Sequence, residues 1–147
     1  MNRLRCSSIA TLAVVLAVVG CGRELPETAA VTGTVTVGGQ PLDEVSVLFI
    51  PSSSGKFSGI TSSDITDADG RFELEYKLPD PKDPSKPTFG PGAMPGSYAV
   101  VVSDYRMLSE MLDPPGRVPE HYGDAGTTPL ECVVGTDDLV FDIEVAP

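Results

Sequence analysis

The sequence has very few of the residues that usually catalyse reactions or bind transition metals. Its 147 residues include no tryptophan, one histidine and three cysteines. Acid–base catalysis most often uses histidine, and the single His121 lies in a Pro-Glu-His-Tyr-Gly segment typical of a surface turn. Zinc sites need clusters of histidine and cysteine, which are missing. We therefore expect a protein that is not an enzyme, with no catalytic residues, no metal and no cofactor.

Basic residues are also scarce. The chain has 10 Lys and Arg against 21 Asp and Glu, which gives a formal net charge of −11. Phosphate backbones repel a protein of this sign. We therefore expect no nucleic-acid partner.

No apolar run is long enough for a transmembrane helix, which needs about 20 residues. The longest is Ile9–Val19, and it follows Arg3 and Arg5. A basic start followed by an apolar run of this length is typical of a signal peptide. We therefore predict a signal peptide over residues 1–20 and export of the chain.

The junction Val18-Val19-Gly20-Cys21 resembles the bacterial lipobox. In that motif the cysteine is diacylated, exposed by cleavage and N-acylated, and several acyl chains together hold a protein almost irreversibly in a membrane. Gly22 follows in place of the Asp that retains such lipoproteins in the inner membrane. The expectation is a lipoprotein with palmitate-type acylation at Cys21, anchored in the cell envelope and preferentially in the outer membrane. An ordinary secretory signal with a chance cysteine is the alternative.

Only one cysteine remains for the folded domain. Cys6 leaves with the signal peptide, Cys21 carries lipid and Cys132 is left, so no internal disulfide can form. Leu130 and Val134 share a strand face with Cys132, which favours a buried thiol that packs as a small hydrophobe. A reactive thiol is the alternative.

After a spacer over residues 21–28, the pattern becomes that of an all-β domain over residues 29–147. Alternating or continuous apolar runs predict seven strands. We pair the first two as a hairpin and the last two as another. The runs cover residues 31–37, 45–50, 60–65, 71–77, 97–103, 130–134 and 139–145.

Two other segments stand out. Residues 79–95 contain six prolines, which predicts a surface excursion that is either a contact surface or a tolerated insertion. Residues 105–112 carry an apolar stripe at helical spacing. The predicted fold is a seven-stranded Greek-key β-sandwich of transthyretin-like or immunoglobulin-like type, with at most one short helix.

Three stretches resemble the carboxypeptidase regulatory-like domain, a transthyretin-like sandwich. They are VTGTVTVGGQPL at residues 31–42, TDADGRF at 66–72 and MPGSYAV at 94–100. A fourth stretch, VPEHY followed by TPLE, is similar to small lipoproteins of planctomycete-like bacteria. In physical terms these motifs build turns and core, and the residues concerned are Gly38, Gly39, Pro41, Asp67, Gly70, Phe72, Pro95, Gly96 and Tyr98.

The acidic turn around Gly70 offers a weak metal candidate. Asp64, Asp67 and Asp69 superficially resemble a calcium loop, but the EF-hand pattern requires further acids and a glycine at its sixth position. That position is Asp69, and a strand begins at Arg71. A turn capped by Asp67 is the favoured interpretation.

These observations lead to three function hypotheses. The first is a non-catalytic, membrane-anchored envelope module that binds another envelope protein or a polysaccharide. The second is a calcium- or small-ligand-binding protein that uses the acidic loops. A hydrolase of the transthyretin-like type comes last, because hydroxyisourate hydrolases of that fold use several histidines and a C-terminal Tyr-Arg-Gly-Ser, whereas this chain ends in Ile-Glu-Val-Ala-Pro.

Overall fold

The structure is a computed structural model of the chain. It describes residues 26–52, 60–80, 82–83, 85–106 and 116–146. The predicted signal peptide, Cys21 and most of the predicted helix over 105–112 lie outside these residues. Among the described residues, no helix is long and apolar enough to cross a membrane.

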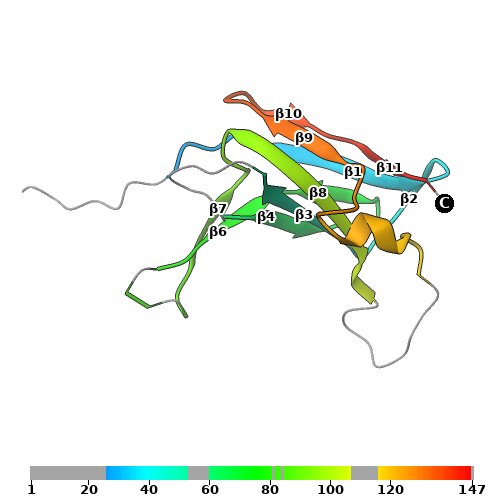
Figure 1. The fold of residues 1–147 in the computed structure, drawn as a ribbon, viewed down its shortest axis with the longest axis horizontal. Coiled ribbons are helices and arrows are strands. Elements are labelled where there is room, and N and C mark those ends of the chain that lie inside the picture. The colour runs from blue at the N-terminus through cyan, green and yellow to red at the C-terminus, as the bar shows by residue number, and fades with distance from the viewer. Residues whose placement is uncertain (1–25, 53–59, 81, 84, 107–115, 147) are drawn as a thin grey trace, which may run out of the picture.

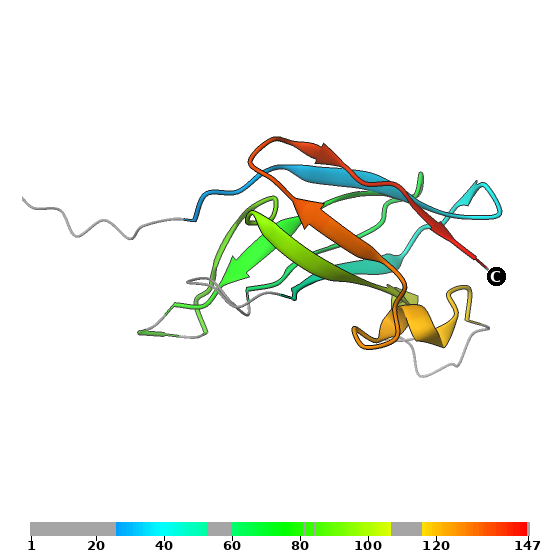
Figure 2. The same cartoon turned by 45° about the horizontal axis from the view of Figure 1, so that its top comes forward.

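The described chain forms two β-sheets packed face to face (Figures 1 and 2), which confirms the predicted all-β sandwich. Sheet one is built on a central β1 that pairs with every other strand of that sheet. Sheet one contains β1 (Val31–Val37), β2 (Gln40–Pro41), β5 (Arg71–Glu73), β10 (Leu139–Val140) and β11 (Ile143–Val145). Sheet two contains, in spatial order, β7 (Thr88–Pro91), β6 (Glu75–Leu78), β4 (Ser62–Ile65), β3 (Val45–Pro51), β8 (Gly96–Asp104) and β9 (Glu131–Val134).

Alternation along the strands creates the core between the sheets. Val31 and Val35 of β1 are fully buried, and so are Val45, Val47 and Phe49 of β3. The valines of β8 are buried on both faces, as their consecutive run predicts. The continuous apolar run at 45–50 likewise predicts a strand that is covered on both sides, and this prediction is wrong. Its alternate residues Ser46, Leu48 and Ile50 are only half-buried.

The predicted hairpin between residues 31–37 and 45–50 is wrong. Across the Gly38–Gly39 turn, β1 pairs only with the two-residue β2, and β3 lies in the other sheet. The chain changes sheet at Glu44, which has a positive φ of 51°. Both strands have an apolar face, and these faces are buried against each other across the sandwich because edge-to-edge pairing would not cover them.

The predicted C-terminal hairpin is also wrong. β9 pairs antiparallel with β8 in sheet two, whereas β10 and β11 pair parallel with β1 in sheet one. The predicted single strand over 71–77 likewise divides at the buried Leu74, where β5 joins sheet one and β6 joins sheet two. Division of the predicted strands over 71–77 and 139–145 adds two strands, and the unpredicted β2 and β7 add two more, so eleven strands are described where seven were predicted.

The proline-rich segment 79–95 is only partly a surface excursion. It contains the edge strand β7, and Ala93 and Met94 after it are buried. Ala93 exchanges backbone hydrogen bonds with Ala29, at 2.9 and 3.0 Å. The segment is therefore tied to the start of the domain. One short 3-10 helix, η1 (Glu120–Gly123), lies near the other end of β8.

Candidate functional site

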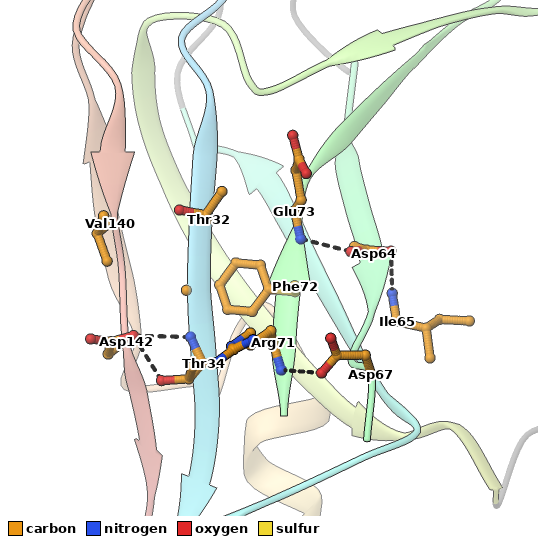
Figure 3. Close-up of a pocket in the computed structure, with 11 residues that line it drawn as sticks. Thr32, Thr34, Asp64, Ile65, Asp67, Arg71, Phe72, Glu73, Val140 and Asp142 are labelled. Carbon is orange, nitrogen blue, oxygen red and sulfur yellow. Dashed lines mark hydrogen bonds between the residues drawn. The ribbon is translucent and has the colours of Figure 1, made fainter. Parts of the chain in front are cut away.

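A shallow, open cleft of about 490 Å³ lies on the solvent-facing side of sheet one (Figure 3). Its floor comes from β1 and β5, one wall comes from β10 and the segment after it, and the other wall comes from the end of β4 and the following turn. Because strand residues alternate between faces, the inward Val31 and Val35 fill the core and the intervening Thr32 and Thr34 form the cleft floor.

Strand register brings the cleft residues together in two rows. In the first row, Thr32 lies opposite both Val140 of β10 and Glu73 of β5. In the second row, Thr34 lies opposite Arg71 and binds Asp142. Three segments that are far apart in the sequence therefore meet on one surface.

Asp142 links the C-terminal segment to β1 through hydrogen bonds to Thr34. Its Oδ1 accepts hydrogen bonds from the backbone N–H of Thr34 at 2.9 Å and from the Thr34 hydroxyl at 2.8 Å. Asp142 lies between the end of β10 and the start of β11. There its carboxylate accepts the hydrogen bond that a backbone carbonyl would accept in a continuous strand. The chain bends inward there, so that a Cβ at Gly33 would lie 2.0 Å from the backbone oxygen of Phe141.

The opposite wall is held by two further carboxylates. Asp64 accepts the backbone N–H groups of Ile65 and Glu73, at 2.8 and 2.7 Å. Asp67 accepts those of Asp69 and Arg71, both at 2.9 Å, which is the capped turn that the sequence favours.

Gly70 closes that turn at φ 72° and its position packs closely on β1, since a Cβ there would lie 2.8 Å from the backbone oxygen of Val35. The residue therefore has to be a glycine for two reasons, the left-handed backbone and the close approach.

The cleft is acidic and rich in hydrogen-bond acceptors. Four carboxylates line it, from Asp64, Asp67, Glu73 and Asp142, against the single guanidinium of Arg71, so the formal net charge of the lining is −3. Exposed apolar side chains stand at two sides, Ile65 at 41% and Val140 at 71% exposed. Such a surface suits a ligand that donates hydrogen bonds or carries positive charge.

The three calcium candidates do not converge. Asp64 and Asp67 are bound to backbone N–H groups, and Asp69 lies 3.6 Å from Arg71 in an exposed ion pair. Within the described ranges, no group of three or more His, Cys, Asp or Glu side chains is arranged to hold a metal ion.

The other residues singled out in the sequence build turns and core. Gly38 and Gly39 have φ of 55° and 76° in the turn between β1 and β2, which includes Pro41. Tyr98 is buried, and its hydroxyl donates a 2.7 Å hydrogen bond to the backbone oxygen of Met94. This bond closes the bend at Pro95, which leads into Gly96 at the start of β8.

Cys132 and His121 take no part in the cleft. Cys132 is buried beside Tyr98, and burial raises the pKa of its thiol. His121 lies exposed on η1 with its ring 4.4 Å from that of Tyr122. Cys21 lies outside the described residues.

The sequence analysis missed a buried ionic cluster at the end of β8. The Asp104 side chain is fully buried and accepts hydrogen bonds from the side chains of Arg106 and Arg117, four of them between 3.0 and 3.1 Å. Arg117 also binds Asp43 at 2.7 Å. Only the occurrence of an acid directly after an apolar strand could have pointed to this cluster.

We compared the chain with protein-family models, curated proteins and solved structures, and none of the three comparisons gave a match.

Proposed function

We propose that the chain is an envelope lipoprotein, acylated at Cys21, whose β-sandwich is a non-catalytic binding module. In this proposal the cleft on sheet one contacts a neighbouring envelope protein or polysaccharide. The turn and core motifs that resemble the carboxypeptidase regulatory-like domain support a module of this type.

The main support for a binding role is that backbone hydrogen bonds fix the carboxylates of the cleft in place. Asp64, Asp67 and Asp142 stand in the walls, and each accepts a backbone N–H group from a strand of the cleft floor. Carboxylates fixed in this way keep their remaining lone pairs in set directions without needing to reorganise, which favours recognition of donor groups.

The anchor is tested by replacing Cys21 with alanine. Labelled palmitate should be incorporated into the wild-type protein, and Cys21→Ala should lose both the label and retention in the membrane fraction, because the acyl chains supply the attachment. Cys132→Ala is the matched control and should keep both. A Cys21→Ala protein that is still labelled and membrane-bound would contradict the anchor.

The binding surface is tested by photo-crosslinking in intact cells. A photoreactive amino acid at Val140, which is 71% exposed on the cleft wall, should give discrete adducts identifiable by mass spectrometry. The control position is Val133, which is 73% exposed on β9 of the other sheet. Adducts at Val133 and none at Val140 would move the contact away from the cleft.

Calcium is the competing ligand for an acidic cleft. Equilibrium dialysis of the purified protein should show no saturable calcium binding, because calcium prefers six to eight oxygen ligands. Saturable calcium binding that is weaker in Glu73→Gln would show that the ligand of the cleft is calcium and not an envelope protein or polysaccharide.

A further inference from the structure

We propose that the β6–β7 hairpin, with Phe89 and the lysines around it, forms a second contact with the lipid surface beside the acyl anchor. The inference rests on the proposed acylation of Cys21. It concerns how the domain lies on the membrane, which the cleft does not determine.

Chain length limits how far the domain can move from the bilayer. Pro26, the first described residue, is five positions after Cys21, so the chain between them spans at most about 17 Å. Strand β8 has nine residues and is about 30 Å long. The end of the sandwich that contains Pro26 therefore stays close to the membrane.

The β6–β7 hairpin is joined to that same end (Figures 1 and 2). Ala29 pairs with Ala93, and one residue, Gly92, lies between Ala93 and the end of β7. A Cβ on the intervening Gly92 would lie 1.9 Å from the backbone oxygen of Ala29. Phe89 is three residues before Gly92, so it lies at most about 11 Å from this junction.

The outward orientation of Phe89 is fixed by its neighbours. Tyr76 is 4% exposed and lies opposite Gly90, where a Cβ would approach the tyrosine ring to 2.5 Å. Only a glycine leaves room for that ring, which sets the register of the two strands. Phe89 then points to the other face beside Lys77 and is 58% exposed.

The hairpin also differs in charge from the rest of the chain. Between Glu75 and Pro91 there are three lysines and three acids, whereas the whole chain has 10 basic and 21 acidic residues. All lysines among the described residues lie here, at positions 77, 82 and 86, and the side chain of Lys86 is 80% exposed. Lysines beside an exposed aromatic ring suit the boundary between anionic headgroups and acyl chains.

Another turn at this end of the domain is acidic. Asp137 and Asp138 lie between β9 and β10, and Asp138 binds the backbone N–H of Ala30 at 3.1 Å. Anionic lipids repel this turn and attract the lysines, so the domain tilts toward the hairpin. One aromatic ring binds weakly by itself, but an anchored domain holds it at a high effective concentration near the bilayer.

The chain has no tryptophan, so the fluorescence of a single introduced tryptophan reports on that position alone. The full acylated protein carrying Phe89→Trp is placed in vesicles of brominated phosphatidylcholine and phosphatidylglycerol. The matched control is Ile65→Trp, an exposed apolar site at the end of β4 next to the Asp67 turn. We expect about twofold stronger quenching and blue-shifted emission for Phe89→Trp, because bromine quenches only rings that reach the acyl chains.

Charge reversal tests the role of the lysines. Adding Lys82→Glu and Lys86→Glu to the Phe89→Trp protein should reduce its quenching to the control level while the protein stays with the vesicles. A retained protein whose Phe89→Trp and Ile65→Trp signals are equal overturns the hairpin contact and leaves the anchor standing. A protein that carries no acyl group overturns both the anchor and the contact.

Discussion

Replacing Gly33 with alanine is expected to lower the free energy of unfolding by about 3 kcal/mol, because the new methyl group has no space. A Cβ at this position would lie 2.0 Å from the backbone oxygen of Phe141 and 2.8 Å from the ring of Phe72. The Phe72 ring could rotate, but the Phe141 backbone is held by a 2.8 Å hydrogen bond to Thr32. The substitution therefore forces the C-terminal segment away from β1.

Gly135→Ala is the matched control for this prediction. Nothing lies within 4 Å of a Cβ at Gly135, and its φ is not in the left-handed region. Alanine there should leave stability unchanged or raise it by about 0.5 kcal/mol, because it restricts the unfolded chain. Urea titrations followed by circular dichroism measure both variants. Equal stabilities for the two would show that the close approach at Gly33 does not exist in solution.

The same glycine illustrates what the sequence can predict. Gly33 alternates with Val31 and Val35, which predicts that it lies on the inward face of the strand over 31–37, and all three residues are buried in β1. Alternation depends only on the geometry of one strand. The same pattern over 71–77 predicts that Phe72, Leu74 and Tyr76 share one apolar face, and all three are buried. It does not say which strand lies beside which.

Strand pairing is the part that the sequence predicts wrongly, since neither predicted hairpin forms. A turn such as Gly38–Gly39 is compatible with a long hairpin or with two paired residues followed by a change of sheet, and the choice depends on burying both apolar faces at once. The bend at Glu44 and the division at Leu74 are consequences of that global requirement.

The cleft was unpredictable for the same reason. Thr32, Glu73 and Asp142 are unremarkable outward residues in the sequence. They become neighbours only because β1 pairs antiparallel with β5 and parallel with β10 and β11. Asp67 was predictable because its hydrogen bonds reach only two and four residues along the chain.

The buried ionic cluster leads to the second large expected effect. Asp104→Asn keeps the shape of the side chain but removes its charge, which leaves the guanidinium groups of Arg106 and Arg117 facing an amide. Removing one partner of a buried ion pair typically costs about 3 to 5 kcal/mol. Both arginines remain partly exposed, at 31% and 23%, so we expect about 3 kcal/mol in urea titrations at pH 7.

Asp83→Asn is the control for this variant. Asp83 also pairs with a base, Lys86 at 3.1 Å, but its side chain is 42% exposed. Exposed ion pairs contribute little to stability, so the urea midpoint of Asp83→Asn should stay close to that of the wild type. A comparable loss for both variants would mean that the effect of Asp104→Asn reflects net charge and not the buried cluster.

The loss caused by Asp104→Asn should depend on pH in a defined direction. Burial alone raises the pKa of Asp104, but hydrogen bonds from Arg117 and Arg106 outweigh it and hold this pKa well below its usual range. The unfolded chain therefore takes up a proton near pH 4 while the folded protein does not. The stabilisation by Asp104 is complete above that pH and falls as the pH decreases toward the folded-state pKa.

The difference in unfolding free energy between wild type and Asp104→Asn should accordingly shrink by about 1 kcal/mol between pH 7 and pH 3. Comparing the variant with the wild type at each pH cancels the carboxyl groups outside the cluster, including Glu144, whose pKa is lowered by its hydrogen bond from Thr36. A difference that stays constant over this range would require an Asp104 with an ordinary pKa. The two arginines would then hold the carboxylate no better than water does.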